Sequence, residues 1–212
     1  MRTKNNMDKH KKHIEVLKRD VFETNSKYPQ FNLLIQNIES LANKIKANEK
    51  IVMLERTLMY GGYSLFGPLF SSAKFISIDC SPEKAEERGP YNKHMISSED
   101  FIRKKYDMRE SSWYNLKEYV NNADYICIPN LVHHVKDQSK MVKAAYDVLK
   151  PGGYIYIFEP LVREIHQIPD DYLRYTQFGM QAVLEKEGFE VTETNTTGGA
   201  FENVWYCWLQ AL

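Results

Sequence analysis

From Lys50 onward, short apolar runs alternate with stretches of helical periodicity, and this alternation constrains the fold more than any other feature of the chain. Four of the runs are candidate buried strands. They are Ile51–Leu54, Lys74–Ile78, Tyr125–Ile128 and Tyr154–Phe158. A helix is expected over Gln138–Leu149, between the last two strands. This strand–helix–strand order predicts an α/β fold with a mostly parallel sheet and right-handed crossovers.

The residues before the first strand have helical patterns only. Apolar side chains recur at helical intervals in Met7–Glu23 and again in Gln30–Ala47. We therefore divide the chain into an N-terminal helical cap, residues 1–48, and a main α/β domain, residues 49–212. The cap is expected to cover a ligand cleft. The alternative is that the two helices only pack on the main domain.

The end of the chain predicts a different kind of sheet edge. Gln177–Glu187 has a helical pattern, and Gly188 is placed to end that helix in a left-handed conformation. Phe189–Thr194 and Val204–Leu209 are candidate strands joined by a glycine-containing turn. Two strands joined in this way form a hairpin. The sheet is therefore expected to have about seven strands and to close with an antiparallel hairpin.

Charge and cysteine usage exclude several classes of protein. Lys plus Arg and Asp plus Glu each number 28, so the net charge is zero and provides no general field for nucleic acid or an anionic membrane. The apolar runs are too short to span a bilayer, and the N-terminus lacks the apolar stretch of a secretory signal. Cys80, Cys127 and Cys207 form no zinc-like or disulfide pattern. We expect a cytoplasmic protein without nucleic-acid or membrane partners.

Four motifs in the second half of the chain occur in a fixed order. Asn130-Leu131-Val132-His133-His134 follows the third strand, and the turn Leu149-Lys150-Pro151-Gly152-Gly153 leads into the fourth. Glu159-Pro160 then ends that strand, and a DDYLRYTQFGMQAVLEKEGFEV stretch follows. Over Asp124–Val191 this order resembles the class I S-adenosylmethionine-dependent methyltransferases. The resemblance implies a Rossmann-like three-layer α/β/α sandwich and a methyl transfer that uses S-adenosyl-L-methionine as cofactor.

The resemblance also assigns residues around the first strand to the cofactor. Glu55 ends that strand and is expected near the amino-acid part of S-adenosylmethionine; the alternative is a solvated carboxylate at a strand end. In the family a glycine-rich loop follows. Here Thr57 and Met59 stand where glycines are usual, and only Gly61 and Gly62 remain. A Cβ atom would hinder the close approach of this loop to a ligand.

Asp79 ends the second strand, 18 residues beyond Gly61. A carboxylate at this place accepts hydrogen bonds from both ribose hydroxyls in nucleotide-binding α/β proteins. The alternative is that Asp79 caps a following helix, because Ser81-Pro82-Glu83 is typical of a helix start. Four further residues are expected to line the cofactor site: Cys80, Asp107 near the adenine (or in a surface loop), Asn130 and Leu131.

The two histidines after the third strand are the candidate catalytic residues. They lie at the carboxyl end of a central strand, where open α/β sheets bind their ligands. Methyl transfer requires alignment of the acceptor and, for some acceptors, removal of a proton, which histidine can accept near neutral pH. Adjacent side chains seldom face the same way, so only one of His133 and His134 is expected to act.

Four later residues are expected on the acceptor side: Glu159, His166, Tyr172 and Arg174. Arg174 would hold an acidic group of the acceptor; the alternative is an ion pair with Asp170 or Asp171. Carboxylates and a histidine together can bind a metal, but their spacing matches no compact ligand motif. The sequence therefore predicts a polar acceptor pocket and no metal site.

Three functions follow from these observations. The first is methyl transfer from S-adenosylmethionine to a small molecule, or to a glycan-like or metabolite hydroxyl or amine. The second is a binding or scaffolding protein that has lost catalysis, suggested by the glycine-poor loop. The third is a nicotinamide-dependent oxidoreductase. The lack of a GxGxxG motif after the first strand argues against it, because the pyrophosphate would have no glycine cradle.

Overall fold

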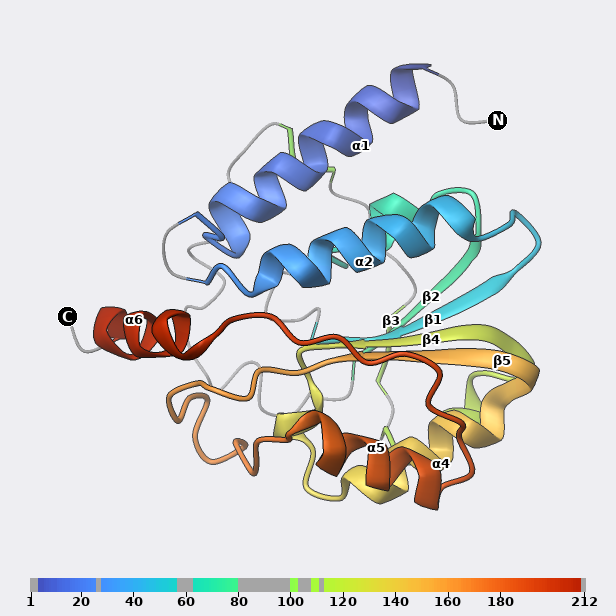
Figure 1. Cartoon of the computed structure of the whole chain (residues 1–212). Helices are drawn as coiled ribbons and strands as arrows, with labels where there is room; N and C mark the ends of the chain where they lie inside the picture. The colour runs from blue at the N-terminus through green and yellow to red at the C-terminus, as the bar shows by residue number, and fades with distance from the viewer. Residues whose placement is uncertain are drawn as a thin grey trace.

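The chain folds around one parallel β-sheet (Figure 1). A computed structural model describes residues 4–25, 28–56, 63–79, 100–102, 108–110 and 113–210. Within them the sheet has five strands in the order β3-β2-β1-β4-β5, and every neighbouring pair is parallel. The strands are β1 (Lys50–Leu54), β2 (Lys74–Asp79), β3 (Met108–Glu110), β4 (Ala123–Pro129) and β5 (Leu149–Phe158). The predicted α/β fold with a parallel sheet is confirmed; β3 falls in a stretch for which we predicted no strand.

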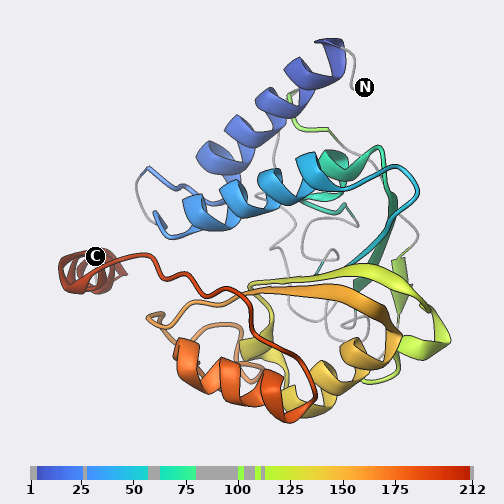
Figure 2. The same ribbon diagram turned by 45° about the vertical axis from the view of Figure 1, so that its right-hand side comes forward.

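Helices cover both faces of this sheet. Helix α1 (Lys4–Val16) continues into a π-helical turn, η1 (Leu17–Val21), and lies with α2 (Phe31–Lys44) on one side. Helices α4 (Gln138–Val148) and α5 (Gln177–Lys186) lie on the other side. The turned view in Figure 2 shows the same separation into helix, sheet and helix layers.

The two faces of β1 explain why two separate cores form. Side chains of a strand alternate between its faces. Ile51 and Met53 accordingly pack in the core with α1 and α2, whereas Val52 and Leu54 pack in the core with α4. All four are fully buried, which accounts for the unbroken apolar run in the sequence.

The N-terminal helices form a layer of the sandwich. Leu34, Ile35 and Ile38 of α2 are fully buried in the same core as β1, together with Phe31, which packs against Phe158 of β5 with ring centroids 5.7 Å apart. The boundary near residue 48 and a covering role toward a cleft remain predictions. What the structure contains is a helix pair whose apolar stripe is buried against the sheet.

His13 joins α1 to the rest of the protein. Its ring is fully buried, its Nε2 lies 2.8 Å from the carbonyl oxygen of Leu65, and its Nδ1 lies 3.1 Å from the amide nitrogen of Ile102. The carbonyl can only accept and the amide can only donate, so the ring must be neutral with its proton on Nε2. Burial lowers the pKa of His13 from 6.5 to about 4. The hydrogen bond to Leu65 partly opposes this shift, and the charge of His10 adds to it.

Replacement of His13 by Ala is expected to lower the free energy of unfolding by about 3 kcal/mol at pH 7.5, because it leaves two buried backbone groups unpaired. The folded protein binds the His13 proton less tightly than the unfolded chain, so stability from this residue falls as the pH drops from 6.5 toward 4. The loss in the variant should therefore be smaller at pH 5. Urea unfolding at both pH values measures it. Lys12→Ala is the control, because the ion pair of Lys12 with Asp100 is exposed; an equal loss in both variants would contradict the role of His13.

The segment Leu149–Gly153, predicted as a turn before the strand, forms the start of β5, where the pairing with β4 shifts register. Gly152 has a φ of +75°, which the Pro-Gly-Gly sequence favours. At Gly153 an added Cβ would lie 3.0 Å from the Lys150 carbonyl oxygen and 3.1 Å from that of Ala123, so close packing of the backbone requires glycine there. Lys150 also forms an ion pair with Asp124, whose other oxygen accepts from the Lys50 amide.

The predicted C-terminal hairpin is not confirmed. Residues 189–199 contain no strand, and the predicted strand Val204–Leu209 lies within helix α6 (Ala200–Gln210). The preceding helix is confirmed as α5, and Gly188 has the expected positive φ, +99°.

The aromatic residues of α6 explain the difference. Phe201, Trp205 and Trp208 are three or four positions apart, which places them on one face of a helix, but the same run also contains enough aromatic residues to resemble a strand. Tyr206 is buried and its hydroxyl donates to the Glu164 carboxylate, which fixes α6 on the loop between β5 and α5. The other three aromatic side chains are largely exposed.

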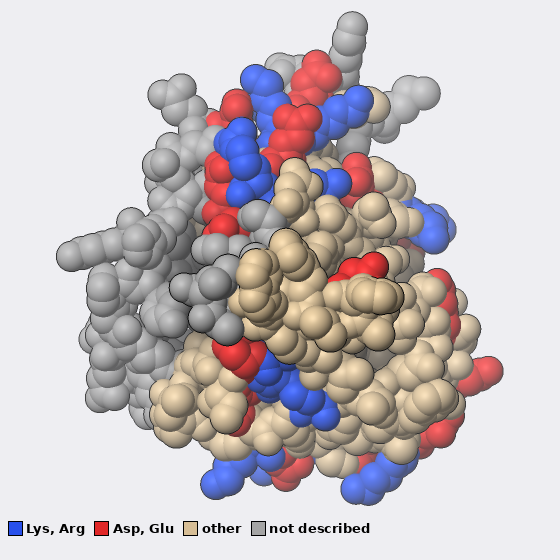
Figure 3. Space-filling model, turned by 60° about the vertical axis from the view of Figure 1, so that its left-hand side comes forward, with Lys and Arg blue, Asp and Glu red and all other residues tan. Residues whose placement is uncertain are grey.

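The surface carries charges of both signs. In Figure 3, Lys and Arg side chains intermix with Asp and Glu at the top of the face shown, where α1 lies, while the centre of that face is mostly uncharged. None of the helices in the described segments combines the length and the hydrophobicity that a bilayer crossing requires.

Candidate functional site

The candidate site lies where four parallel strands end. Parallel strands place their carboxyl ends at one edge of the sheet, and open α/β sheets bind ligands there. The register pairs Leu54 with Ile78 and Pro129 with Phe158, so the residues that follow these pairs are neighbours. These residues form what we call the rim: Glu55, Asp79, Asn130 and Glu159.

Glu55 and Asp79 lie side by side at the ends of β1 and β2. Only 6% of Glu55 and 2% of Asp79 are exposed. A Glu55 carboxylate oxygen accepts from the Ser77 hydroxyl at 2.8 Å, and the Glu55 amide donates to the Ile78 carbonyl at 3.1 Å. The alternative of a solvated Glu55 therefore does not describe this carboxyl group, which is buried between two strands.

The pKa of Glu55 is raised from 4.5 to about 7. Burial is the largest cause, and the negative charge of Asp79 adds to it, while hydrogen bonds from Ser64, Ser77 and the Leu65 amide oppose it. The group is thus close to half-ionised at neutral pH. A cation placed beside it would lower its pKa and make it fully charged.

Glu55→Gln tests this. The folded protein binds the Glu55 proton more tightly than the unfolded chain, so stability from the wild-type residue is lost as the pH rises from 4.5 through about 7. The variant cannot ionise, and its free energy of unfolding relative to wild type is expected to rise by about 3 kcal/mol between pH 4.5 and pH 8. Denaturant unfolding at a series of pH values measures the change. A pH-independent difference between the two proteins would contradict the buried, protonated carboxyl.

Asn130 begins the loop after β4 in a left-handed conformation, with a φ of +58°. Its amide donates to the Phe158 carbonyl at 2.8 Å, which fixes the loop to β5. Its side-chain oxygen, Oδ1, is buried and has no hydrogen-bond partner within the described residues. A buried polar atom without a partner is costly unless a ligand or water satisfies it, so Oδ1 is a candidate ligand contact. Leu131, next to it, is buried and apolar.

Glu159 holds the loop that carries the two histidines. Its Oε1 accepts from the amides of Leu131 at 2.6 Å and Val132 at 2.5 Å. Its Oε2 lies 2.5 Å from Nδ1 of His133. Both carboxylate oxygens are therefore engaged by η6 (Val132–His134) and the residue before it.

A third histidine joins the two that the sequence singled out. His133 and His134 lie in η6, and His166 reaches them from the loop between β5 and α5. The ring centroids are 3.9 Å apart for His133 and His134, 5.1 Å for His133 and His166, and 4.8 Å for His134 and His166. We call these three residues the histidine cluster.

The cluster is largely inside the protein. Only 1% of His133 and 6% of His134 are exposed, and 12% of the His166 side chain. Burial lowers the pKa of His134 well below its usual range, with the neighbouring His133 as the next cause. Burial, and then the charge of Arg163, lowers the pKa of His166 to about 4. Both imidazoles are therefore neutral at physiological pH.

Arg174 forms an ion pair with Asp171, which was the alternative to its binding an acidic group of the acceptor. Two of its nitrogens donate to the two carboxylate oxygens of Asp171, at 2.5 and 2.9 Å. This paired geometry keeps the pKa of Asp171 well below its usual range. Tyr172 donates its amide to the His133 carbonyl at 2.8 Å and its hydroxyl to Asp170 at 3.0 Å. These side-chain hydrogen bonds of Tyr172 and Arg174 are thus made within the loop between β5 and α5.

Four predicted cofactor residues lie outside the described residues: Gly61, Gly62, Cys80 and Asp107. Conversely, two residues at the site were not singled out by sequence. Ser77 donates to Glu55 from the interior of β2, and Arg56 donates to Gln167, which ties the end of β1 to the loop after β5. Ser77 interrupts an apolar strand, and this polar residue in a buried run was the available signal.

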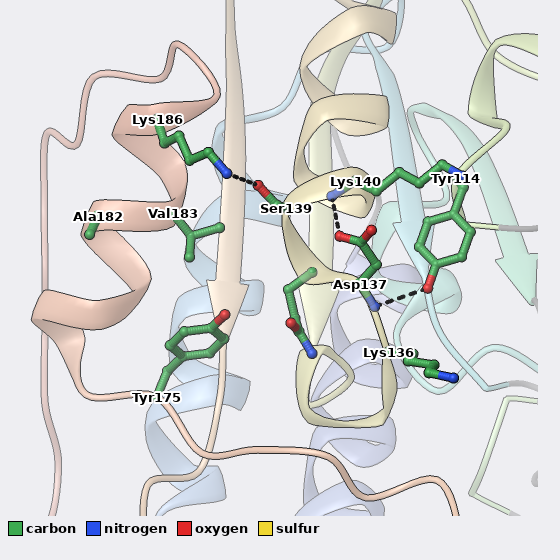
Figure 4. A pocket seen from close by; sticks show the side chains of 10 residues that line it. Tyr114, Lys136, Asp137, Ser139, Lys140, Tyr175, Ala182, Val183 and Lys186 are labelled. Carbon is green, nitrogen blue, oxygen red and sulfur yellow. Dashed lines mark hydrogen bonds between the residues drawn. The ribbon is translucent and has the colours of Figure 1, made fainter.

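A cavity of about 700 Å³ lies elsewhere, between the start of α4 and α5. In Figure 4, Lys186 of α5 reaches Ser139 of α4, with 3.2 Å between Nζ and the hydroxyl, and Tyr114 lies on the far side of Asp137. Its lining residues are Tyr114, Lys136, Asp137, Gln138, Ser139, Lys140, Tyr175, Ala182, Val183 and Lys186. None of them belongs to the rim or to the histidine cluster.

Comparison with known proteins gives a family match and a common fold. Residues 61–157 match the family model of the methyltransferase domain. No curated protein sequence matches the chain. Among solved structures, the fold is shared with a chain of the complex between the Haloferax volcanii Trm112 methyltransferase activator and a methyltransferase, at 13% identity and a TM-score of 0.54, covering 91% of this chain and 79% of that one.

Two further structures have the same fold. One is described as a methyltransferase of Bacillus halodurans C-125, with 16% identity, a TM-score of 0.54, and coverage of 74% of this chain and 69% of that one. The other is the [4+2]-cyclase SpnF, with 16% identity, a TM-score of 0.51, and coverage of 75% and 58%. At such identities these likenesses establish the fold alone. Together with the family match they confirm the resemblance to class I methyltransferases.

Proposed function

We propose that this chain, which has the class I methyltransferase fold and a segment of the methyltransferase-domain family, transfers a methyl group from S-adenosylmethionine to an acceptor. The acceptor is a hydroxyl or amine of a small molecule, either a metabolite or a glycan-like compound. The observation that carries the proposal is the pair of buried carboxyl groups, Glu55 and Asp79, at the ends of adjacent parallel strands.

The residues of the rim fit the parts of S-adenosylmethionine. Asp79 would accept hydrogen bonds from the two ribose hydroxyls. Glu55, with a pKa of about 7, would ionise beside the cofactor's ammonium group. The unpartnered Oδ1 of Asn130 would accept a further hydrogen bond. We also assign Gly61, Gly62, Cys80, Asp107 and Leu131 to this site.

The His133–Glu159 pair suits proton removal from the acceptor. When bound, S-adenosylmethionine supplies an electrophilic methyl group on its sulfonium. Glu159 lies 2.5 Å from Nδ1 of His133, so it orients the ring and stabilises its protonated form, while Nε2 accepts the acceptor's proton. His134 adjoins this base, and Glu159, His166, Tyr172 and Arg174 shape the acceptor side from the same loop region.

An isotope experiment tests the activity. The protein is incubated with S-adenosylmethionine carrying a deuterated methyl group and with a fractionated metabolite extract, and products are examined by mass spectrometry. We expect at least one compound that gains the labelled methyl group only when active protein is present. The control is His133→Asn, which removes the proposed base. Product formation that is equal with His133→Asn and wild type over the pH range 6 to 9 would contradict the base, and no labelled product with any extract would contradict the activity.

A second candidate function is binding or scaffolding without catalysis. It is favoured by the engagement of both Glu159 oxygens within the protein and by the glycine-poor loop after β1. This hypothesis expects no S-adenosylmethionine binding. Thermal unfolding with S-adenosylhomocysteine present distinguishes the two, because a ligand that binds the folded state raises the unfolding temperature.

A further inference from the structure

Ring nitrogens of the three histidines lie close together in the interior of the protein. Nε2 of His133 lies 3.3 Å from Nε2 of His166. One ring nitrogen from each of His133, His134 and His166 lies within 4.8 Å of the others. Two nitrogens bound to the same tetrahedral zinc ion, each about 2.0–2.1 Å from the metal, are about 3.3 Å apart. The 3.3 Å between the His133 and His166 nitrogens thus equals the spacing of two ligands that share one ion, and the ligand nitrogen of His134 lies within 4.8 Å of both.

The outer nitrogen of each ring determines where its proton lies. Nδ1 of His133 is 2.5 Å from the Glu159 carboxylate, and Nδ1 of His134 is 2.5 Å from the carbonyl oxygen of Asp170. Nδ1 of His166 is 3.2 Å from both the Asp171 carboxylate and the Glu164 carbonyl. All of these oxygens accept hydrogen bonds, so each neutral ring carries its proton on Nδ1 and a lone pair on Nε2.

The facing lone pairs of His133 and His166, with a His134 ring nitrogen close by, favour a positive group between them. Two lone pairs facing each other at 3.3 Å repel, and reversing the His166 ring tautomer would only move the repulsion to its contacts with Asp171 and Glu164. A metal ion or a shared proton resolves this arrangement. Metal-bound histidines typically donate their other ring nitrogen to a carboxylate or a carbonyl, and all three do so here.

We propose that His133, His134 and His166 bind one divalent transition-metal ion, with zinc as the best match, through their Nε2 atoms. Three imidazoles with a fourth position left for water or substrate are a ligand set of catalytic zinc. Glu159, the Asp170 carbonyl and Asp171 orient the ligands from outside. The ligand chemistry excludes magnesium and calcium as preferred ions, because both select oxygen ligands.

The metal would change the acceptor chemistry of the site, a consequence that rests on the proposed function. An ion on Nε2 of His133 occupies the lone pair that the base would use. An acceptor hydroxyl bound at the fourth position would instead lose its proton more readily because the ion stabilises the alkoxide. Metal binding itself requires no S-adenosylmethionine, so it can be tested separately from methyl transfer.

The test uses the whole chain without an affinity tag, freed of metal by chelation and dialysis. Zn²⁺ is titrated in by calorimetry, and Co²⁺ binding is followed by the visible absorption of a tetrahedral cobalt site. We expect one equivalent of either ion to bind per chain. His166→Gln is expected to weaken Zn²⁺ binding by more than 100-fold. Glu159→Gln, which leaves all three ligands in place but alters the partner that orients His133, is expected to weaken it by about 10- to 100-fold.

His10→Gln is the matched control, because His10 lies in α1 and contributes no ligand to the cluster. It should bind Zn²⁺ as tightly as wild type. Circular dichroism of the metal-free variants checks that each is folded. The proposal is overturned if folded wild-type protein takes up no zinc, which would leave a shared proton between the rings, or if His10→Gln weakens binding as much as His166→Gln. Failure of methyl transfer with intact zinc binding would contradict only the proposed function.

Discussion

Replacement of Asp79 by Ala is expected to weaken the binding of S-adenosylmethionine by about 100-fold or more. This carboxylate is proposed to accept two hydrogen bonds from the ribose. Because the acceptor is charged, each bond contributes about 1.5 kcal/mol or more. Because 1.4 kcal/mol corresponds to a tenfold change in affinity, their joint loss gives the expected factor. Calorimetric titration of wild type and variant measures it.

The control for this prediction is Asp147→Ala. Asp147 is paired with Lys117 and Lys143 on the surface, remote from the rim, and its removal should leave affinity unchanged. The Asp79 variant also has an internal check: loss of its charge should lower the pKa of Glu55, since that charge is one of the causes that raise it. Unchanged affinity in a folded Asp79→Ala protein would contradict the assignment of the ribose site.

Glu159→Ala is expected to lower the free energy of unfolding by about 3 kcal/mol or more. The carboxylate accepts from the amides of Leu131 and Val132 and from the His133 ring, and its removal leaves these buried donors unpaired. Each buried unsatisfied group costs about 1–3 kcal/mol, and water entering the space offsets part of the sum. Urea denaturation of the metal-free protein measures the loss.

Two comparisons isolate the cause. Glu159→Gln keeps one acceptor oxygen and should lose about half as much stability. Glu185→Ala removes an exposed carboxylate on α5 that accepts from the Gln181 side chain, and it should change stability by less than about 0.5 kcal/mol. A Glu159→Ala protein as stable as the Glu185 variant would show that the loop before α4 does not depend on this carboxylate.

The sheet could be predicted because its strands are buried on both faces. Ile51–Leu54 appears as an unbroken apolar run since alternate side chains enter the two cores, one beneath α2 and the other above α4. The carboxyl groups at the ends of β1 and β2 could also be located, because a parallel sheet brings strand ends to one edge. Their burial and contacts were not predictable, as Ser77 and the Ile78 carbonyl reach Glu55 from a neighbouring strand.

Helix α6 and the histidine cluster could not be predicted from local sequence patterns, because both depend on tertiary contacts. The aromatic run in α6 fits both a strand and a helix, and the tertiary contact of Tyr206 with Glu164 accompanies the helical outcome. The histidine cluster joins His133 to His166 through an irregular loop whose course no periodicity specifies. The pairing of Glu159 with the His133 loop could have been predicted from the sequence, because β4 and β5 are adjacent and both residues follow their strands.

A crystal structure of the protein with S-adenosylhomocysteine tests the central claim most directly. We predict ligand density over the rim, with both ribose hydroxyls within hydrogen-bonding distance of the Asp79 carboxylate and the ligand's ammonium group beside Glu55. Density at another place, such as the cavity between α4 and α5, or a ligand whose ribose has no contact with Asp79, would contradict the account.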